Sequence, residues 1–269
     1  MNTFTDTLYQ KYYNLIYQNL GVYFNSTKKD MLQAKLDKLL RLNSIESYEQ
    51  YYELLKKTDN QYWTEFVDEI TVHQTNFFRE DNHFEFIRSQ LRFILDTNKR
   101  IMTNHEIRVW SAGCSTGEEP YTLGMVLKEW LPPDISIKIL ATDISSKTLA
   151  RAQNGIYPLI VKKDMDPYYI GEYFERKEEF YNVAPVIKDM VTFRLFNLID
   201  PFPFQNTFDF IFCRNVMIYF DNKVQQELIA KFFKAITPGG LLFIGHSESL
   251  VNKQSGFEYL QPTIYLKKA

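Results

Sequence analysis

The chain has 269 residues, of which 45% are hydrophobic and 16% aromatic, so it has ample material for a buried core and its composition argues against disorder. A formal net charge of −2 gives no overall attraction to nucleic acid or to an acidic membrane. Polar residues interrupt Met1–Tyr17 and no long apolar run follows, so neither a signal peptide nor membrane insertion is expected. The length suits one large domain, or a medium domain plus a small one.

The cysteines and histidines show no metal-binding pattern. Cys114 and Cys213 belong to no Cys-x-x-Cys or Cys/His cluster, so we expect free thiols in a reducing, cytoplasmic setting. The histidines are scattered without the spacing of ligands, and no metal site is predicted. They are His73, His83, His105 and His246.

Residues 1 to about 70 predict helices and no strand. Thr27 and Asp30 have capping-box spacing before a helix that runs to about Leu42, and Ser47 and Gln50 have it before a helix over Tyr48–Lys57. Basic side chains follow one flank of the first of these helices. They are Lys28, Lys35, Lys38 and Arg41. This basic flank is either an ordinary solvated face or a docking surface for an acidic partner.

From about residue 107 the pattern changes to alternating strands and helices, which predicts a largely parallel sheet covered by helices on both faces. The expected strands are Ile107–Ala112, Ile137–Thr142, Val191–Leu198, Phe208–Cys213, Gly240–Gly245 and Thr263–Lys267. The expected helices are Tyr121–Trp130, Ser146–Gln153 and Val224–Ala235. Pro238-Gly239-Gly240 is expected to stop a helix before a strand. Between Ile156 and Met190 the alternation breaks, which we interpret as an inserted excursion.

The segment Val109–Tyr121 reads as a strand, a glycine-containing turn and a helix that begins near Pro120. Open α/β sheets hold nucleotide-like ligands with this layout, although an ordinary strand-to-helix turn has the same outline. Glu118 and Glu119 lie where a pyrophosphate would have to lie, so a nucleoside with a cationic end suits the turn better. S-adenosylmethionine has both features. Asp143 ends the next strand and is well placed to accept two hydrogen bonds from a ribose diol.

Four segments resemble the chemotaxis receptor methyltransferases, the CheR family, in order and spacing over nearly the whole chain. They are Thr75–Glu80, Trp110–Tyr121, Phe212–Asp221 and Gly245–Glu248. The resemblance implies a small all-helical domain followed by an α/β, class I (Rossmann-like) methyltransferase domain with a small inserted β-subdomain.

We place the domain boundaries accordingly. The helical domain spans residues 1–72 and is implied to dock the receptor. A linker and a helix that contacts the cofactor span 73–106. The catalytic domain spans 107–269, with its inserted subdomain at about 156–190.

The family transfers the methyl group of S-adenosylmethionine to glutamate side chains of chemoreceptor cytoplasmic helices, forming methyl esters in chemotactic adaptation. The resemblance therefore implies this cofactor, S-adenosylhomocysteine as its product, and a chemoreceptor cytoplasmic domain as partner. We expect a monomer that binds no nucleic acid. Two alternatives stay open: a class I methyltransferase that acts on another substrate, and a cofactor-binding scaffold that has lost transfer.

Site residues are carried over position by position. Arg79 is implied to face the methionine carboxylate, Glu119 the methionine amino group, and Asp143 the ribose. His73 stands where relatives have an asparagine, and imidazole can also donate one hydrogen bond. The residues implied to bind the cofactor are His73, Thr75, Arg79, Glu119, Asp143, Asn197, Leu198, Arg214 and Asn215.

Tyr219 and Arg79 are the implied catalytic residues, with Tyr219 near the transferred methyl group. The plainer alternatives are a half-buried packing tyrosine for Tyr219 and a surface ion pair with Glu80 or Asp81 for Arg79. A glutamate carboxylate has a pKa of about 4.3, so the nucleophile is already ionised and needs no general base.

Some relatives dock a receptor C-terminal peptide as an added strand on the β-subdomain. The matching stretch here, Tyr173–Val183, has no glycine and is rich in charged side chains. Charges of this kind blunt a sheet edge. We therefore predict that this chain does not depend on such a tether, and the resemblance favours docking through the basic flank.

Overall fold

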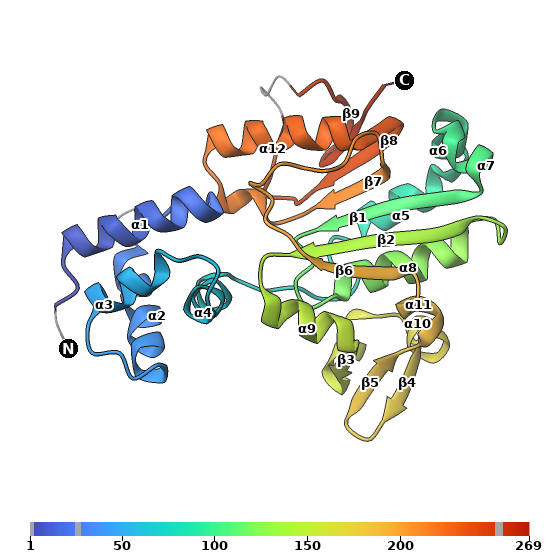
Figure 1. Cartoon of the computed structure of the whole chain (residues 1–269). Helices are drawn as coiled ribbons and strands as arrows, with labels where there is room; N and C mark the ends of the chain where they lie inside the picture. Colours follow the sequence, from blue (N-terminus) through green and yellow to red (C-terminus); the bar gives the residue numbers. More distant parts are fainter. Residues whose placement is uncertain (1–2, 25–27, 251–254, 269) are drawn as a thin grey trace.

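In the computed structural model, which describes residues 3–24, 28–250 and 255–268, a helical unit lies beside a sheet unit (Figure 1). The helical unit comprises α1 (Asp6–Leu20), α2 (Lys29–Leu42), α3 (Tyr48–Leu55) and α4 (Gln61–Ile70). Its core includes the fully buried side chains of Tyr12, Leu36 and Tyr51. Burial of each such side chain contributes roughly 1.5–3 kcal/mol, so packing of the apolar faces stabilises helices this short.

A side-chain cap explains where α3 begins. Ser47 Oγ accepts a hydrogen bond from the backbone N–H of Gln50 at 3.2 Å, which confirms the predicted cap of α3. That helix ends at Leu55, two residues before the predicted end. For α2, Lys28 occupies the N-cap position without a side-chain hydrogen bond, and Thr27 of the expected capping box lies outside the described residues.

The main sheet has the strand order β6-β2-β1-β7-β8-β10-β9. Its strands are β1 (Glu106–Ala112), β2 (Ser136–Asp143), β6 (Val191–Leu195), β7 (Phe208–Cys213), β8 (Ile236–Ile244), β9 (Glu258–Gln261) and β10 (Ile264–Leu266). The first five in spatial order pair in parallel, and β10 pairs antiparallel with both β8 and β9. The prediction of a largely parallel sheet is confirmed. No prediction covered β9, because this short, half-exposed strand lacks a continuous hydrophobic run.

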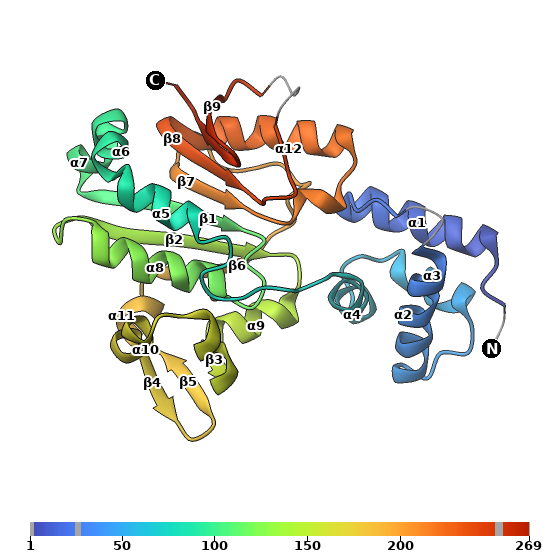
Figure 2. The same cartoon turned by 180° about the vertical axis from the view of Figure 1, so that it is seen from behind.

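Helices cover both faces of the sheet. One face carries α5 (Asn82–Ser89), α6 (Leu91–Thr97), α7 (Lys99–Asn104) and α8 (Glu118–Trp130), as Figure 2 shows, and the other carries α12 (Asn222–Ala235). Along β7, Phe210 and Phe212 pack towards the first group, and Ile211 towards α12. Three short helices thus stand where one was expected within 73–106. No helix in the described part of the chain has the length and apolar character needed to cross a membrane.

The expected role of Pro238-Gly239-Gly240 is wrong. Helix α12 ends at Ala235, β8 begins at once at Ile236, and the three residues lie inside the strand. The pairing of β7 with β8 shifts register here, as at a β-bulge. Gly239 has a φ of +79°, and a Cβ at this position would lie 2.6 Å from the carbonyl oxygen of Thr97. The glycine therefore permits a kinked strand against the end of α6.

The inserted segment follows α9 (Ser146–Asn154) and builds a small sheet of its own, of order β3-β5-β4, below the main sheet in Figure 1. Its elements are β3 (Ile156–Pro158), the 3₁₀ helix η2 (Leu159–Asp164), α10 (Pro167–Tyr173), β4 (Phe174–Lys177), β5 (Phe180–Val183) and α11 (Pro185–Lys188). Phe77 anchors it, with ring centroids 4.9 Å from Tyr157 and 5.4 Å from Phe174. The link between the two units thus also supports the insertion.

Candidate active site

A cleft opens at the carboxyl ends of β1, β2 and β7, where the strand order reverses. Open α/β sheets bind ligands at this switch point. Every residue predicted to bind the cofactor lines this one cleft, together with Tyr219. The helical unit supplies the opposite wall, with Leu20, Val22, Phe24 and Met31. Residues far apart in the sequence thus form a single site.

The turn after β1 shapes one end of the cleft, where Asp143 lies. Gly113 has a φ of +91°, and a Cβ there would lie 2.4 Å from a methyl carbon of Val216, so only glycine lets the two loops approach this closely. The carboxylate of Asp143 accepts hydrogen bonds from the backbone N–H groups of Ser115 at 2.9 Å and Ser145 at 3.0 Å, one on each oxygen. Each oxygen keeps lone pairs for a diol. The Ser115 hydroxyl is buried and has no protein partner among the described residues, which fits a polar ligand.

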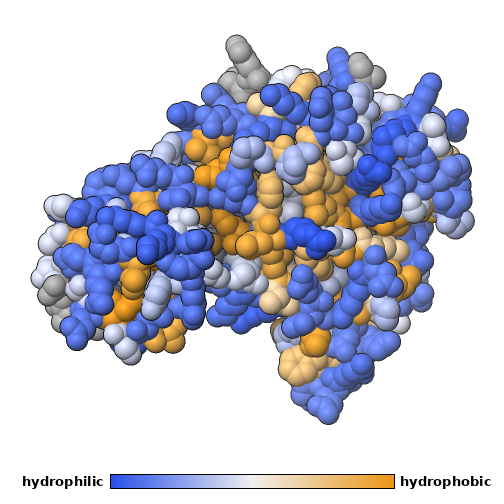
Figure 3. Space-filling view, viewed as in Figure 1, coloured by the Kyte–Doolittle hydropathy of each residue, from blue (hydrophilic) through white to orange (hydrophobic). Residues whose placement is uncertain are grey.

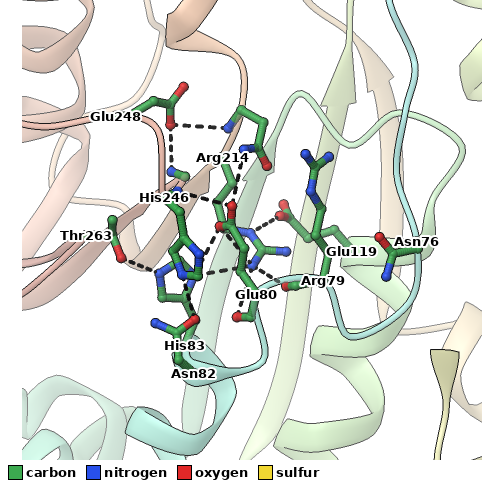
Figure 4. Close-up of polar contacts among 12 residues, drawn as sticks. Asn76, Arg79, Glu80, Asn82, His83, Glu119, Arg214, His246, Glu248 and Thr263 are labelled. Carbon is green, nitrogen blue, oxygen red and sulfur yellow. Dashed lines mark hydrogen bonds and ion pairs between the residues drawn. The ribbon is translucent and has the colours of Figure 1, made fainter.

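At the other end of the cleft, Glu119 lies in the first turn of α8 and is buried. Its Oε1 accepts a hydrogen bond from Ser111 Oγ at 2.6 Å, and its Oε2 accepts one from Arg214 Nε at 2.7 Å. The guanidinium of Arg214 also donates to the backbone carbonyl of Arg79 at 2.5 Å (Figure 4). The guanidinium of Arg214 therefore links the side chain of Glu119 to the backbone of Arg79.

Arg79 lines the cleft, and its side chain donates to the backbone carbonyl of Gln74 at 2.6 Å. Among the described residues, no ion pair joins it to Glu80 or Asp81, so the surface ion-pair alternative does not describe this structure. The charge of Arg79 instead affects the pKa of Tyr219. Burial raises the pKa of the Tyr219 phenol, and Arg79 opposes that rise in pKa. The phenol is therefore protonated at neutral pH and can donate a hydrogen bond.

A partly buried carboxylate, that of Glu248, holds the loop that carries Tyr219. Glu248 accepts hydrogen bonds from the backbone N–H groups of Gly245 at 2.6 Å, Asn215 at 3.2 Å and Ile218 at 3.2 Å. Burial raises the pKa of Glu248, and these backbone donors oppose the rise. Asn215 has a φ of +58°, and its buried Oδ1 has no partner among the described residues, so it can accept from a cofactor ammonium.

The end of α1 fixes the same loop from the helical unit. The backbone N–H of Tyr23 donates to the carbonyl of Tyr219 at 2.8 Å, and the Tyr17 hydroxyl donates to Asp221 at 2.6 Å. Asn197 donates its side-chain amide to the carbonyl of Asn19 at 2.7 Å, so this amide joins the two units. Its neighbour Leu198 is a buried residue that lines the cleft.

His73 offers the cleft a different group from the one expected. Its Nε2 lies 2.7 Å from Thr71 Oγ1, and that hydroxyl donates to the carbonyl of Val67 at 2.7 Å. The Nε2–H must therefore donate to Thr71, which leaves Nδ1 as an acceptor. Burial lowers the pKa of His73, so the ring is neutral at neutral pH. The donor anticipated from the sequence is already used, and Thr75 lines the cleft two residues further on.

Two of the histidines are closer together than their sequence spacing indicates. Ligand atoms of Glu80, His83 and His246 all lie within 4.8 Å of one another. The Arg214 guanidinium lies 3.2 Å from His83 Nδ1 and 3.7 Å from Glu80 Oε2, however. A positive charge in this position opposes the binding of a metal ion there.

The basic flank is not one continuous face. Lys35 donates to the backbone carbonyl of Glu69 at 2.7 Å, and burial lowers its pKa. Lys38 forms an exposed ion pair with Glu69 at 2.6 Å, and Arg41 is exposed. Lys28 lines the cleft instead. Lys35 thus helps to hold α2 against α4, while Lys38 and Arg41 remain available to a partner.

Both cysteines are buried free thiols, as expected. Burial raises the pKa of Cys114 and of Cys213 well above the ordinary value. A protonated, inaccessible thiol is unreactive, so neither cysteine supplies a nucleophile.

The fold and the cleft define a class I methyltransferase with a nucleoside-cofactor site at the switch point of its sheet. Residues 73–266 match the profile of the CheR methyltransferase, SAM binding domain, and residues 7–71 match that of the CheR methyltransferase, all-alpha domain. The chain belongs to the CheR methyltransferase family. It is an S-adenosylmethionine-dependent methyltransferase of chemotaxis.

Relatives match this chain over most of their own length. The chain is 39% identical over 259 residues to the chemotaxis protein methyltransferase of Borreliella burgdorferi, which covers 94% of this chain and 91% of the relative. It is 34% identical over 268 residues to the chemotaxis protein methyltransferase of Escherichia coli, and this alignment covers 97% of this chain and 91% of the relative. Among solved structures, a putative sarcosine dimethylglycine methyltransferase from Galdieria sulphuraria aligns at 12% identity and a TM-score of 0.36, covering 61% of this chain and 46% of that chain.

Asp143→Ala is expected to weaken S-adenosylhomocysteine binding by about 1–3 kcal/mol, or roughly 5- to 150-fold, because the two ribose contacts predicted for its carboxylate would be lost. Isothermal titration calorimetry measures this change. Asp143 also accepts hydrogen bonds from the backbone N–H groups of Ser115 and Ser145, so the substitution could disturb the fold. The thermal unfolding midpoint of the variant is therefore measured as well, and it must equal that of the wild type. Wild-type affinity in the variant would remove Asp143 from the site.

Proposed function

We propose that this protein transfers the methyl group of S-adenosylmethionine to glutamate side chains of chemoreceptor cytoplasmic helices, forming methyl esters in chemotactic adaptation. One observation carries the proposal: the cleft that contains Tyr219 lies between the two units, and the helical unit forms its outer wall. A side chain from a macromolecule must enter between them. The relatives are named chemotaxis protein methyltransferases, which supports a chemoreceptor as that macromolecule and the cytoplasm as the site of action. The protein acts as a monomer.

The surface around the cleft suits an amphipathic helix. Apolar residues gather where the helical unit meets the sheet unit (Figure 3). Met31 and Val72 are large hydrophobic residues that line the cleft and stay exposed, at 39% and 55%. Lys28 lines the same cleft and can meet an acidic side chain. A helix with an apolar face and a row of glutamates complements these groups.

Transfer of a methyl group to an ionised carboxylate requires no general acid or base from the protein. The cofactor supplies a methyl group activated by a sulfonium, and this group passes to the glutamate oxygen while the carbon–sulfur bond breaks and leaves a neutral thioether. No proton moves in this step. The protein must orient the carboxylate and exclude water from it. Tyr219 offers a protonated hydroxyl for orientation, and Val216 and Phe220 supply apolar lining beside it.

Transfer of a tritiated methyl group to parallel pools tests the proposal. The pools are a receptor cytoplasmic fragment, tRNA and a small-molecule extract. Label in the receptor fragment supports the proposal, and label in either other pool supports a class I methyltransferase with another substrate. Binding of S-adenosylhomocysteine without label in any pool would indicate a scaffold that has lost transfer.

Charge reversal at Lys38 and Arg41 is expected to slow receptor methylation at low salt, through association, because exposed charges steer encounter with an acidic helix. The defect in kcat/KM should shrink as salt rises. Lys56→Glu with Lys57→Glu is a matched control, since Lys56 also forms an exposed ion pair, with Glu53 at 2.7 Å. Equal rates in the two double variants at low salt would show that the basic flank is only solvated.

A peptide with the receptor's C-terminal sequence is expected to show no micromolar binding. Strand β4 is an open edge of the small sheet, but Glu175, Arg176 and Lys177 on it are exposed and charged. Such side chains disfavour an added strand. Fluorescence anisotropy of a labelled peptide measures the affinity. Micromolar binding that is lost when residues 174–183 are substituted would overturn the prediction.

A further inference from the structure

Arg214 connects the two residues that are proposed to hold the amino-acid end of the cofactor. Its Nε donates to the carboxylate of Glu119, and its terminal nitrogen donates to the backbone carbonyl of Arg79. The guanidinium carbon lies 5.6 Å from the ring centroid of Phe84 and 5.9 Å from that of Phe212. Only 3% of the Arg214 side chain is exposed. The position of this one buried cation therefore sets the spacing between Glu119 and Arg79.

Among the residues that the structure describes, His83 is the one side chain outside the cleft that accepts a hydrogen bond from this cation. It is fully buried in α5, and its Nδ1 lies 3.2 Å from the terminal nitrogen of Arg214 (Figure 4). A guanidinium can only donate, so Nδ1 must carry a lone pair. On the far side of the ring, Nε2 lies 2.7 Å from Thr263 Oγ1, and that hydroxyl donates to the carbonyl of Pro262 at 2.5 Å. The proton of His83 therefore resides on Nε2.

The surroundings keep this histidine neutral. Burial and the charge of Arg214 lower the pKa of His83 to about 3. The other polar groups that face the ring are Glu80, whose Oε2 is 4.0 Å from Nδ1, and the ring of His246, at 5.7 Å between centroids. His83 is thus a neutral acceptor at any physiological pH, which can orient Arg214 without weakening its pairing with Glu119.

We propose that His83 is a positioning residue for the amino-acid end of the cofactor. Acting through Arg214, it fixes the relative placement of Glu119 and Arg79, and it makes no contact with the cofactor itself. The inference rests on the proposed roles of Glu119 and Arg79 towards the ammonium and carboxylate groups. Disturbing His83 should therefore affect ligands that carry an amino-acid end and spare those that lack it.

Two ligands separate this role from general stability. S-adenosylhomocysteine carries the amino-acid end, and 5′-methylthioadenosine has the same adenosine and a thioether but lacks that end. His83→Asn places a side-chain oxygen near Nδ1 and can keep the hydrogen bond from Arg214, whereas His83→Gln places its amide near Nε2 and cannot. His246→Gln is the matched control, because His246 is exposed and its Nε2 contacts Asn82, outside the cleft.

In His83→Gln we expect the Kd for S-adenosylhomocysteine to rise about tenfold, as for loss of a hydrogen bond to a charged group. The Kd for 5′-methylthioadenosine should stay within about twofold. His83→Asn and His246→Gln should resemble the wild type with both ligands. Calorimetry on full-length protein, after thermal unfolding has shown each variant to be folded, gives all of these values.

The outcomes distinguish failure of the inference about His83 from failure of the proposed roles of Glu119 and Arg79. If the wild type binds both ligands equally, the proposed roles of Glu119 and Arg79 are wrong. If the wild type prefers S-adenosylhomocysteine and His83→Gln keeps the same preference, His83 does not position the site. Equal weakening of both ligands in His83→Gln, or failure of that variant to fold while His83→Asn is normal in binding, would mark the histidine as a packing residue and also overturn the inference.

Discussion

Tyr219→Phe is expected to lower the turnover of receptor methylation by about 100-fold, the order of loss that follows misplacement of a reacting group. Its affinity for S-adenosylhomocysteine should change less than about twofold. The hydroxyl is the group proposed to orient the attacking carboxylate, and phenylalanine keeps the ring that packs in the cleft. Initial rates at saturating cofactor and calorimetry on the same preparation give the two numbers.

Tyr259→Phe is the matched control for this comparison. Tyr259 lies on β9, is 54% exposed, and does not line the cleft, so loss of its hydroxyl should change neither quantity. Equal losses of affinity and turnover in Tyr219→Phe would instead mark Tyr219 as a binding or packing residue, the plainer alternative that its sequence position leaves open.

Arg214→Met is expected to lower the free energy of unfolding by about 3–5 kcal/mol, because it leaves the buried carboxylate of Glu119 without its counter-ion. The side chains of Arg214 and Glu119 are only 3% and 10% exposed, so water cannot replace the lost partner. Urea denaturation measures the change, and S-adenosylhomocysteine binding should fall in parallel.

An exposed ion pair provides the comparison for this variant. Lys56 and Glu53 have side chains 50% and 64% exposed, and Lys56→Met should cost less than about 1 kcal/mol. If Arg214→Met were no more destabilising than Lys56→Met, the Arg214–Glu119 pair would not organise the site.

Much of the fold could be predicted from hydrophobic patterning. The runs at Ile107–Ala112 and Phe208–Cys213 predicted β1 and β7 to within one residue, because strands buried on both faces leave continuous apolar sequence. Some short elements were not predicted, namely α6, α7 and β9, because packing rather than local pattern decides their structure. The prediction that Pro238–Gly240 forms a turn between a helix and a strand was wrong, because turn residues inside a strand can also mark a bulge.

The cleft residues were found from short motifs, but the groups that hold them were not. Arg214 was predicted, but His83 was not, because it lies 131 residues away in the sequence and only the packing of α5 against the end of β7 brings it to Arg214. Glu248 lies in a segment that was singled out, yet nothing in its neighbourhood reveals that it accepts from the backbone of the Tyr219 loop. Lys35 has the spacing of an exposed flank and instead holds the end of α4.

Release of methanol by base from a labelled receptor fragment tests the central proposal most directly. A glutamate methyl ester is cleaved by mild alkali to volatile methanol, whereas methyl groups on nitrogen or thioether sulfur are retained. The fragment is incubated with this protein and S-adenosylmethionine carrying a tritiated methyl group. We predict that most of the label becomes volatile after alkali, and that glutamine in place of the modified glutamates prevents labelling. Label that is retained after alkali, or that enters the glutamine variant equally, would contradict the proposed function.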